Sequence, residues 1–175
     1  MIETERLLIV PFSERYLTPR YVGWLNDPEV VRYSDQRYKS HTLESCREYW
    51  GSFTGTPHYF WAIVARDCEL GHIGTLTAYV DPPHSVADLA ILIGDPAVWG
   101  EGCGSEAWSA TCSYLLGSGG MRKVTAGTLA QNKGMLGIMR RTGMVEDGVR
   151  IRQYLFEGQE TDMVCAAIFR EGDVN

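Results

Sequence analysis

Three glycines spaced two residues apart form the feature of this sequence best suited to bind a ligand. Gly100, Gly102 and Gly104 stand directly before an amphipathic helix that starts at about Ser105. Glycine accepts positive φ, so consecutive N–H groups can converge, and a helix N-terminus adds free donors and partial positive charge. This pattern indicates a diphosphate-binding loop, although a strand-to-helix turn without a ligand would produce the same spacing.

A carboxylate stands upstream of this loop. Asp88 directly precedes the apolar run 89–93, which is typical of a buried strand. Alternation along a strand places Asp88, Ala90 and Leu92 on one face. An unpaired carboxylate is costly to bury, so Asp88 is either a functional acid–base group or a strand-end residue that caps or pairs with an arginine.

The elements that must position these groups follow from apolar periodicity, caps and turns. We expect strands over residues 6–12, 59–65, 70–79, 89–93, 123–129, 150–156 and 163–169. We expect short helical pieces after Thr18 and Asp27 and longer helices from Thr42, Ser105 and Asn132. This order predicts an α/β (α+β) chain that forms one domain over residues 1–175, with a mixed central sheet of about seven strands and helices on both faces.

Composition excludes several other classes of protein. The net charge of −6 argues against nucleic-acid binding, and no apolar run approaches the length of a membrane span. The polar N-terminus lacks a signal-peptide pattern. Five scattered cysteines and four histidines show no disulfide or metal-ligand spacing, so we expect a cytoplasmic protein without a metal.

The segment Trp99-Gly-Glu-Gly-Cys-Gly-Ser-Glu-Ala107 resembles the coenzyme A pyrophosphate loop of the GNAT superfamily of acyl-CoA-dependent N-acetyltransferases. Gly102 and Gly104 match the two small positions of that loop. Thr4-Glu-Arg-Leu-Leu8 and residues 132–144 resemble the branch that contains ribosomal-protein-alanine N-acetyltransferases. The resemblance covers nearly the whole chain in order and implies the GNAT fold with acetyl-CoA as co-substrate. A dinucleotide-binding oxidoreductase is a poor alternative, because its glycine loop belongs near the start of a βαβ unit.

The resemblance also implies where the cofactor lies. In this family two central strands splay apart, and the pantetheine arm lies between them like a further strand. That arrangement assigns the arm to the backbone of Ile91, Leu92 and Ile93 and to the side chain of Asn132, which is also a helix N-cap. Arg141 is expected near the 3′-phosphate region. The expected pyrophosphate-binding residues are Trp99, Gly100, Glu101, Gly102, Cys103, Gly104 and Ser105.

Asp88 stands where the resembled branch commonly carries a glutamate general base, so we expect it to deprotonate the amine, through water because aspartate is shorter. The expected acceptor-site residues are Trp24, Arg32, Tyr33 and Tyr154. The sequence departs from the family at the general acid, because Met139 and Met135 replace its usual tyrosine and serine.

Several questions stay open at this level. The acceptor is expected to be a primary amine, either a protein N-terminus or a small molecule such as an amino sugar, a polyamine or an antibiotic. Without the usual tyrosine and serine, a non-catalytic acyl-CoA-binding or interaction module is the alternative function. A homodimer is compatible with the sequence.

Overall fold

The computed structural model describes residues 1–67, 69–170 and 172. The strands are β1 (Ile2–Glu3), β2 (Leu7–Pro11), β3 (Tyr59–Ala65), β4 (His72–Asp81), β5 (Val86–Ile93), β6 (Lys123–Leu129), β7 (Val145–Phe156) and β8 (Gln159–Phe169). The α-helices are α1 (Pro19–Asn26), α2 (Leu43–Gly51), α3 (Cys103–Leu116) and α4 (Lys133–Arg141). Three short 3₁₀ helices are η1 (Glu14–Tyr16), η2 (Asp35–Tyr38) and η3 (Pro96–Val98).

The strands form one mixed sheet in the order β1-β2-β3-β4-β5-β6-β8-β7. Neighbouring strands are antiparallel except β5 and β6, which are parallel and are joined through α3. This arrangement confirms the expected fold class. The described sheet has eight strands rather than about seven because the two-residue strand β1 pairs with β2.

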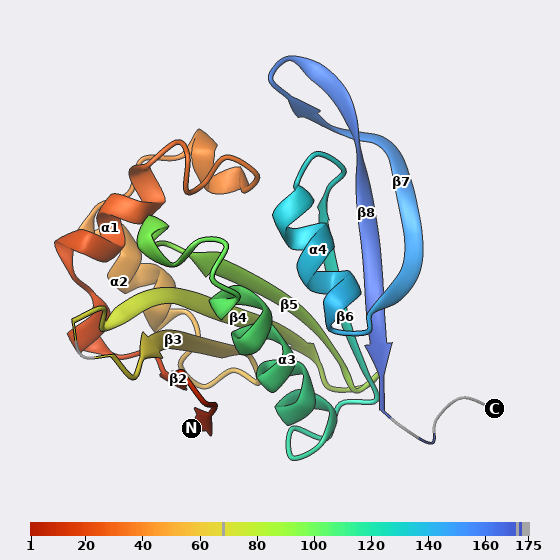
Figure 1. Cartoon of the computed structure of the whole chain (residues 1–175), viewed down its shortest axis with the longest axis horizontal. Helices are drawn as coiled ribbons and strands as arrows, with labels where there is room; N and C mark the ends of the chain where they lie inside the picture. Colours follow the sequence, from red (N-terminus) through yellow and green to blue (C-terminus); the bar gives the residue numbers. More distant parts are fainter. Residues whose placement is uncertain (68, 171, 173–175) are drawn as a thin grey trace.

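Helices cover both faces of the sheet (Figure 1). On one face, α1 and α2 pack over an aromatic core in which Phe12 stacks on Phe60 with ring centroids 4.3 Å apart. On the other face, α3 and α4 bury Trp108, Leu115 and Met139. The sheet therefore lies between two hydrophobic cores, one on each of its faces.

Side-chain caps begin the helices α1 and α2. The Thr18 hydroxyl accepts the N–H of Tyr21, and Thr42 forms a capping box with Ser45. The expectation of a second helical piece after Asp27 is wrong. Asp27 instead ends α1 in an extended conformation, and its carboxylate accepts the N–H of Glu29 in a turn.

None of the described helices combines the length and hydropathy needed to cross a bilayer, and the longest, α3, has 14 residues.

Candidate active site

The central feature of the site is a wedge between β5 and β6. These two strands pair only over their first three residues, from Val86↔Lys123 to Asp88↔Thr125. Beyond that point β5 continues beside β4 and β6 continues beside β8. The sheet therefore opens between Asp88 and the ends of both strands, with the N-terminal part of α3 and all of α4 beside the opening (Figure 1).

The hydrogen-bonding register decides which backbone groups line this wedge. Gly94 N–H donates to the Ile73 carbonyl at 2.9 Å, and bonded pairs alternate along an antiparallel ladder. The backbone groups of Leu92 therefore face β4, whereas those of Ile91 and Ile93 face the wedge. The Ile93 carbonyl already accepts a hydrogen bond from the Trp99 indole at 2.9 Å. Of the three residues expected to hold a pantetheine arm, Ile91 thus has the backbone best placed to do so, and Leu92 is turned away.

Asp88 lies where the two strands part. It is exposed, and its Oδ1 accepts a hydrogen bond of 2.6 Å from the Thr125 hydroxyl on β6. Its Oδ2 has no partner among the described residues. Ala90, next along the same face, is exposed as well, whereas Leu92 packs against the α1–α2 core. The face of β5 around Asp88 is therefore uncovered on the side where α1 and α2 lie.

A row of hydroxyl and carboxyl groups crosses the sheet at this point. Tyr79 on β4 is the register partner of Asp88 and is 44% exposed. Its hydroxyl lies 2.9 Å from the hydroxyl of Tyr49 on α2. Burial, followed by the bond with Tyr79, raises the pKa of Tyr49, so the Tyr49 hydroxyl stays protonated near neutral pH. Thr125, Tyr79 and Tyr49 are absent from the sequence-based site because only strand register brings them beside Asp88.

The glycine loop lies at the end of the wedge that is opposite Asp88. Gly102 is the N-cap of α3 with φ of 85°, and no side chain caps this helix. The N–H groups of Cys103, Gly104 and Ser105 belong to the first turn, which has no intrahelical acceptors. The side chain of Cys103 is buried, and burial raises its thiol pKa, so this residue offers its backbone and not a thiolate.

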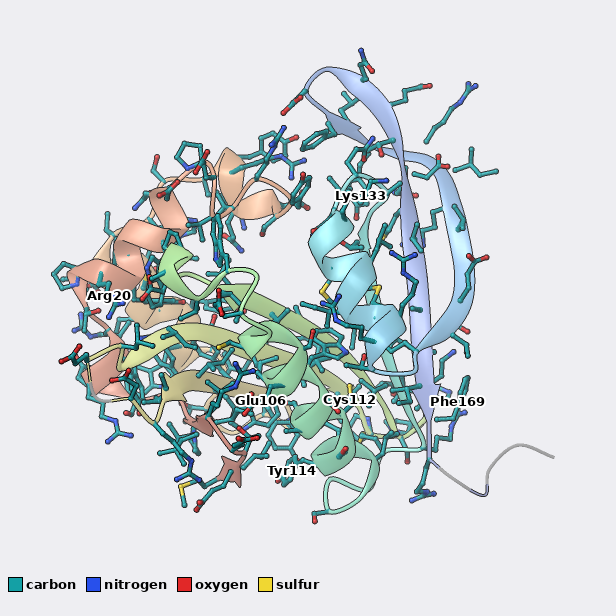
Figure 2. The ribbon with its side chains drawn as sticks, in the orientation of Figure 1. Arg20, Glu106, Cys112, Tyr114, Lys133 and Phe169 are labelled. Atoms are coloured by element: carbon teal, nitrogen blue, oxygen red, sulfur yellow. The ribbon has the colours of Figure 1, made fainter. Side chains whose placement is uncertain are left out.

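The N-terminal segment supports this loop. Arg6 donates to the carbonyl of Glu101 at 2.8 Å and to the carboxylate of Glu106 at 2.7 Å. Glu106, in the first turn of α3 (Figure 2), also accepts the Thr4 hydroxyl and the Arg6 N–H. Partial burial acts to raise the pKa of Glu106, but these hydrogen bonds outweigh it and lower that pKa. The Thr4–Leu8 motif, quoted above only as a resemblance, thus has a structural function that the sequence did not show.

The last helix approaches the same loop from the other side. Arg141 on α4 donates from Nε and Nη2 to the Ser105 hydroxyl at 3.1 and 3.0 Å. Two guanidinium groups, Arg6 and Arg141, therefore flank the start of α3. Asn132 caps α4 through Oδ1 and donates from Nδ2 to Thr128 at 3.0 Å. The capping role of Asn132 is confirmed, and its contact with a pantetheine arm stays a prediction.

These features fit a coenzyme A group. The uncapped first turn of α3 presents N–H donors, two arginines flank it, and β5 presents unpaired backbone along the wedge. Such a set can hold a diphosphate and hydrogen-bond an amide-bearing arm without any metal ion. The described residues contain no cluster of three or more histidine, cysteine or acidic side chains that could hold one.

The predicted acceptor residues divide into two groups. Trp24 is 7% exposed and packs so closely on Gly94 that it belongs to the core rather than to a surface wall. Arg32 pairs with Glu157 at 2.8 Å, and Tyr33 stacks on Phe156. Their loop therefore contacts the β7–β8 hairpin.

Two further bonds complete this contact. Arg37 and Tyr38 both donate to the Leu155 carbonyl at 3.3 Å. Tyr154, half-buried on β7, pairs with Thr161 in the same hairpin. These contacts join the loop after α1 to the β7–β8 hairpin. Arg32 and Tyr33 therefore lie against the hairpin that carries Tyr154.

The general-acid positions of the resembled family offer no acidic group here. Met139 is 3% exposed inside the α3–α4 core, and Met135 packs against the same core. The hydroxyl that contacts Asp88 comes instead from Thr125, and Tyr79 is the register partner of Asp88 on β4.

Comparison with solved structures shows the same fold in proteins of low sequence identity. A GNAT-family acetyltransferase from Bacillus anthracis is 20% identical, covers 97% of this chain and 98% of its own, and superimposes with a TM-score of 0.82. Spermidine N-acetyltransferase from Vibrio cholerae in complex with CoA and spermine is 14% identical over 95% and 97%, with a TM-score of 0.83. RimL, a ribosomal L7/L12 α-N-protein acetyltransferase in complex with coenzyme A, is 15% identical over 97% of both chains, with a TM-score of 0.84. No curated protein sequence matches the chain significantly.

A family model described as an acetyltransferase (GNAT) domain matches residues 6–145, which include Arg6, Asp88, the glycine loop and α4. With four fifths of its length inside that model and the splayed sheet described above, the chain belongs to the GNAT acetyltransferase family.

Proposed function

We propose that this protein transfers the acetyl group of acetyl-CoA directly to a primary amine, with Asp88 as the general base. The observation that carries the proposal is the position of Asp88. It lies where β5 and β6 part, with Oδ1 held by Thr125 and Oδ2 free. A base there is adjacent to both the wedge and the uncovered face of the sheet.

Each part of the site has a distinct task in this reaction. The first turn of α3, with Arg6 and Arg141 beside it, holds the diphosphate, and the backbone of Ile91 orients the acyl-bearing arm. Acetyl-CoA supplies a thioester whose carbonyl carbon forms a bond to nitrogen as its bond to sulfur breaks. Asp88 takes the proton that the ammonium form of the acceptor must lose, directly or through one water molecule.

The hydrogen bond from Thr125 fixes the orientation of this carboxylate. Because one oxygen of the carboxylate is held, the carboxylate does not rotate freely. The other oxygen stays in one position, which favours proton transfer to it. A thiolate is a good leaving group that solvent can protonate. The reaction therefore needs no general acid at the positions of Met139 and Met135.

The test is thiol release from acetyl-CoA with a panel of primary amines. Asp88→Asn should lower kcat/KM by about two to four powers of ten, the usual contribution of a general base, while the acetyl-CoA Kd stays within about twofold. Asp81→Asn is the matched control, because Asp81 ends the neighbouring strand β4 and pairs with His84 outside the row of polar groups. It should retain wild-type kcat/KM.

Two outcomes would overturn the proposal. Full activity of Asp88→Asn would remove Asp88 as the base. Binding of acetyl-CoA without thiol release across the whole panel would instead support a non-catalytic acyl-CoA-binding module.

The structural neighbours extend the panel to protein N-termini and polyamines, since one is a ribosomal-protein acetyltransferase and another a spermidine acetyltransferase.

A further inference from the structure

A cavity of about 240 Å³ lies between α1, α2 and the segment that leads from η2 into α2. Tyr21, Leu25, Cys46 and Tyr49 contribute aromatic and apolar surface to it. Gln36, Lys39, Ser40, His41 and Ser45 contribute its polar groups. The volume accommodates several non-hydrogen atoms of a ligand, and none of the residues named for the acceptor site from the sequence lines it.

One polar atom at this cavity lacks a partner. The backbone of His41 is held at both ends by Asn26, whose Oδ1 accepts the His41 N–H and whose Nδ2 donates to the His41 carbonyl, each at 2.9 Å. The imidazole Nε2 is buried, yet it has no hydrogen-bond partner among the residues that the structure describes. Buried polar atoms are nearly always satisfied, so an unsatisfied nitrogen on a residue that lines a cavity points to a ligand atom that completes it.

The charge around the cavity is positive. None of the described residues that line it is acidic, and Lys39 is among them. The adjacent Arg37 donates to three backbone carbonyls and to the Tyr38 hydroxyl, and it makes no ion pair with a described carboxylate. Lys39 is therefore the only lysine, arginine, aspartate or glutamate among the described lining residues, and its charge favours an anionic group.

The cavity is connected to the reacting centre through Tyr49. This residue lines the cavity, and its hydroxyl lies 2.9 Å from that of Tyr79, the register partner of Asp88. Tyr49 is thus the residue shared by the cavity and the row of polar groups that ends at Asp88.

We propose that this cavity receives an oxyanion, a carboxylate or a phosphate, carried by the acceptor amine. The inference rests on the proposed acetyl transfer and narrows its acceptor class. His41 Nε2 donates to the oxyanion, and Lys39 supplies the complementary charge. A polyamine would instead place a second cation against Lys39 and Arg37, so polyamines are poor acceptors.

Paired acceptors that differ only in the anion test this proposal. Glucosamine 6-phosphate against glucosamine gives the phosphate arm, and a short peptide ending in a free carboxylate against its C-terminal amide gives the carboxylate arm. Spermidine is the polycationic comparison. At least one anionic member should exceed its neutral partner about tenfold in kcat/KM, the equivalent of one well-placed charged contact, and spermidine should be the weakest. The arm with the larger ratio identifies the source of the oxyanion.

Variants of Lys39 locate the effect. Lys39→Glu should remove the preference for the anionic member, measured as the ratio of the two kcat/KM values in a pair, and Lys39→Arg should keep that ratio. His41→Phe should weaken the same anionic acceptor without changing the acetyl-CoA Kd. Equal rates for both members of each pair, a preference for spermidine, or a preference that survives in Lys39→Glu would each overturn the proposal.

A separate measurement distinguishes this proposal from the proposed function. Calorimetry of glucosamine 6-phosphate and of the carboxylate peptide, with coenzyme A present, reads the cavity without turnover. Binding that Lys39→Glu abolishes supports the oxyanion site even if no amine releases thiol, in which case only the acetyl transfer fails. The site itself is refuted if both Lys39→Glu and His41→Phe still bind the probes as the wild-type protein does. It is also refuted if the wild-type protein binds neither anionic probe.

Discussion

Replacement of Gly102 by glutamate would place an anion where the diphosphate is expected to bind. Gly102 is the N-cap of α3 at φ of 85°, and a Cβ added there would lie 3.3 Å from Arg6 Nη2. A side chain at this φ costs about 1–2 kcal/mol of folding free energy. The helix dipole and Arg6 offset part of that cost, because both favour a carboxylate at this position. The variant should therefore fold.

The cost should appear in cofactor affinity. A carboxylate about 5 Å from a phosphate oxygen, at an effective dielectric constant of about 20, raises the free energy of binding by about 3 kcal/mol. That corresponds to about a hundredfold increase in the Kd for acetyl-CoA. Titration calorimetry with acetyl-CoA measures this change directly, and circular dichroism checks that the variant is folded.

Two controls separate charge from backbone strain. Gly102→Ala introduces the strain without the charge and should weaken acetyl-CoA binding much less. Gly120→Glu introduces both at a glycine with φ of 73° and open space around it, near the far end of α3, and should leave the Kd unchanged. An unchanged Kd in folded Gly102→Glu, or an equal loss in Gly120→Glu, would refute the assignment of the loop.

Two further predictions concern the core behind the site. Burial lowers the pKa of His72 from 6.5 to about 4; the bond to Gly74 opposes this shift in part, and the charge of Arg20 adds a smaller lowering effect. Because the unfolded chain then binds a proton that the folded chain does not, stability should fall as pH drops from about 6.5 towards 4, by about 2 kcal/mol at pH 5. His72→Phe should remove that part of the pH dependence in urea unfolding, and an identical pH profile would contradict this origin. In Gly94→Ala the new Cβ would lie 2.0 Å from buried Trp24, so the free energy of unfolding should drop by about 1–3 kcal/mol. Gly51→Ala, in open space and without a positive φ, separates that clash from the loss of a glycine alone, and equal losses in both variants would exclude the clash.

Local signals in the sequence were sufficient for most elements. The strand over residues 123–129 has the predicted bounds, and the caps at Thr18, Thr42 and Asn132 start helices as expected. These features depend on neighbours within a few residues, so apolar periodicity and capping chemistry reveal them. The second helical piece failed because Asp27 forms a turn with Glu29, a local alternative that the same residue types allow.

The site was predictable where it is made of one continuous segment. Spacing alone indicated the glycine loop and its helix, and alternation placed Asp88 on the face it occupies. The sequence also determined that Leu92 and Asp88 share a side-chain face, because the period of a strand is two.

Tertiary structure alone decided the groups that come from separate strands and helices. Register with β4 and β6 sets Tyr79 and Thr125 beside Asp88, and the same register turns the backbone of Leu92 away from the wedge. Packing of α1 against α2 creates the cavity at His41, and the fold of the N-terminus brings Arg6 to the glycine loop. Strand register and helix packing join residues tens of positions apart, and no local periodicity carries that information. The chain therefore encodes its glycine loop in adjacent residues, whereas the surroundings of its predicted base exist only once the sheet has formed.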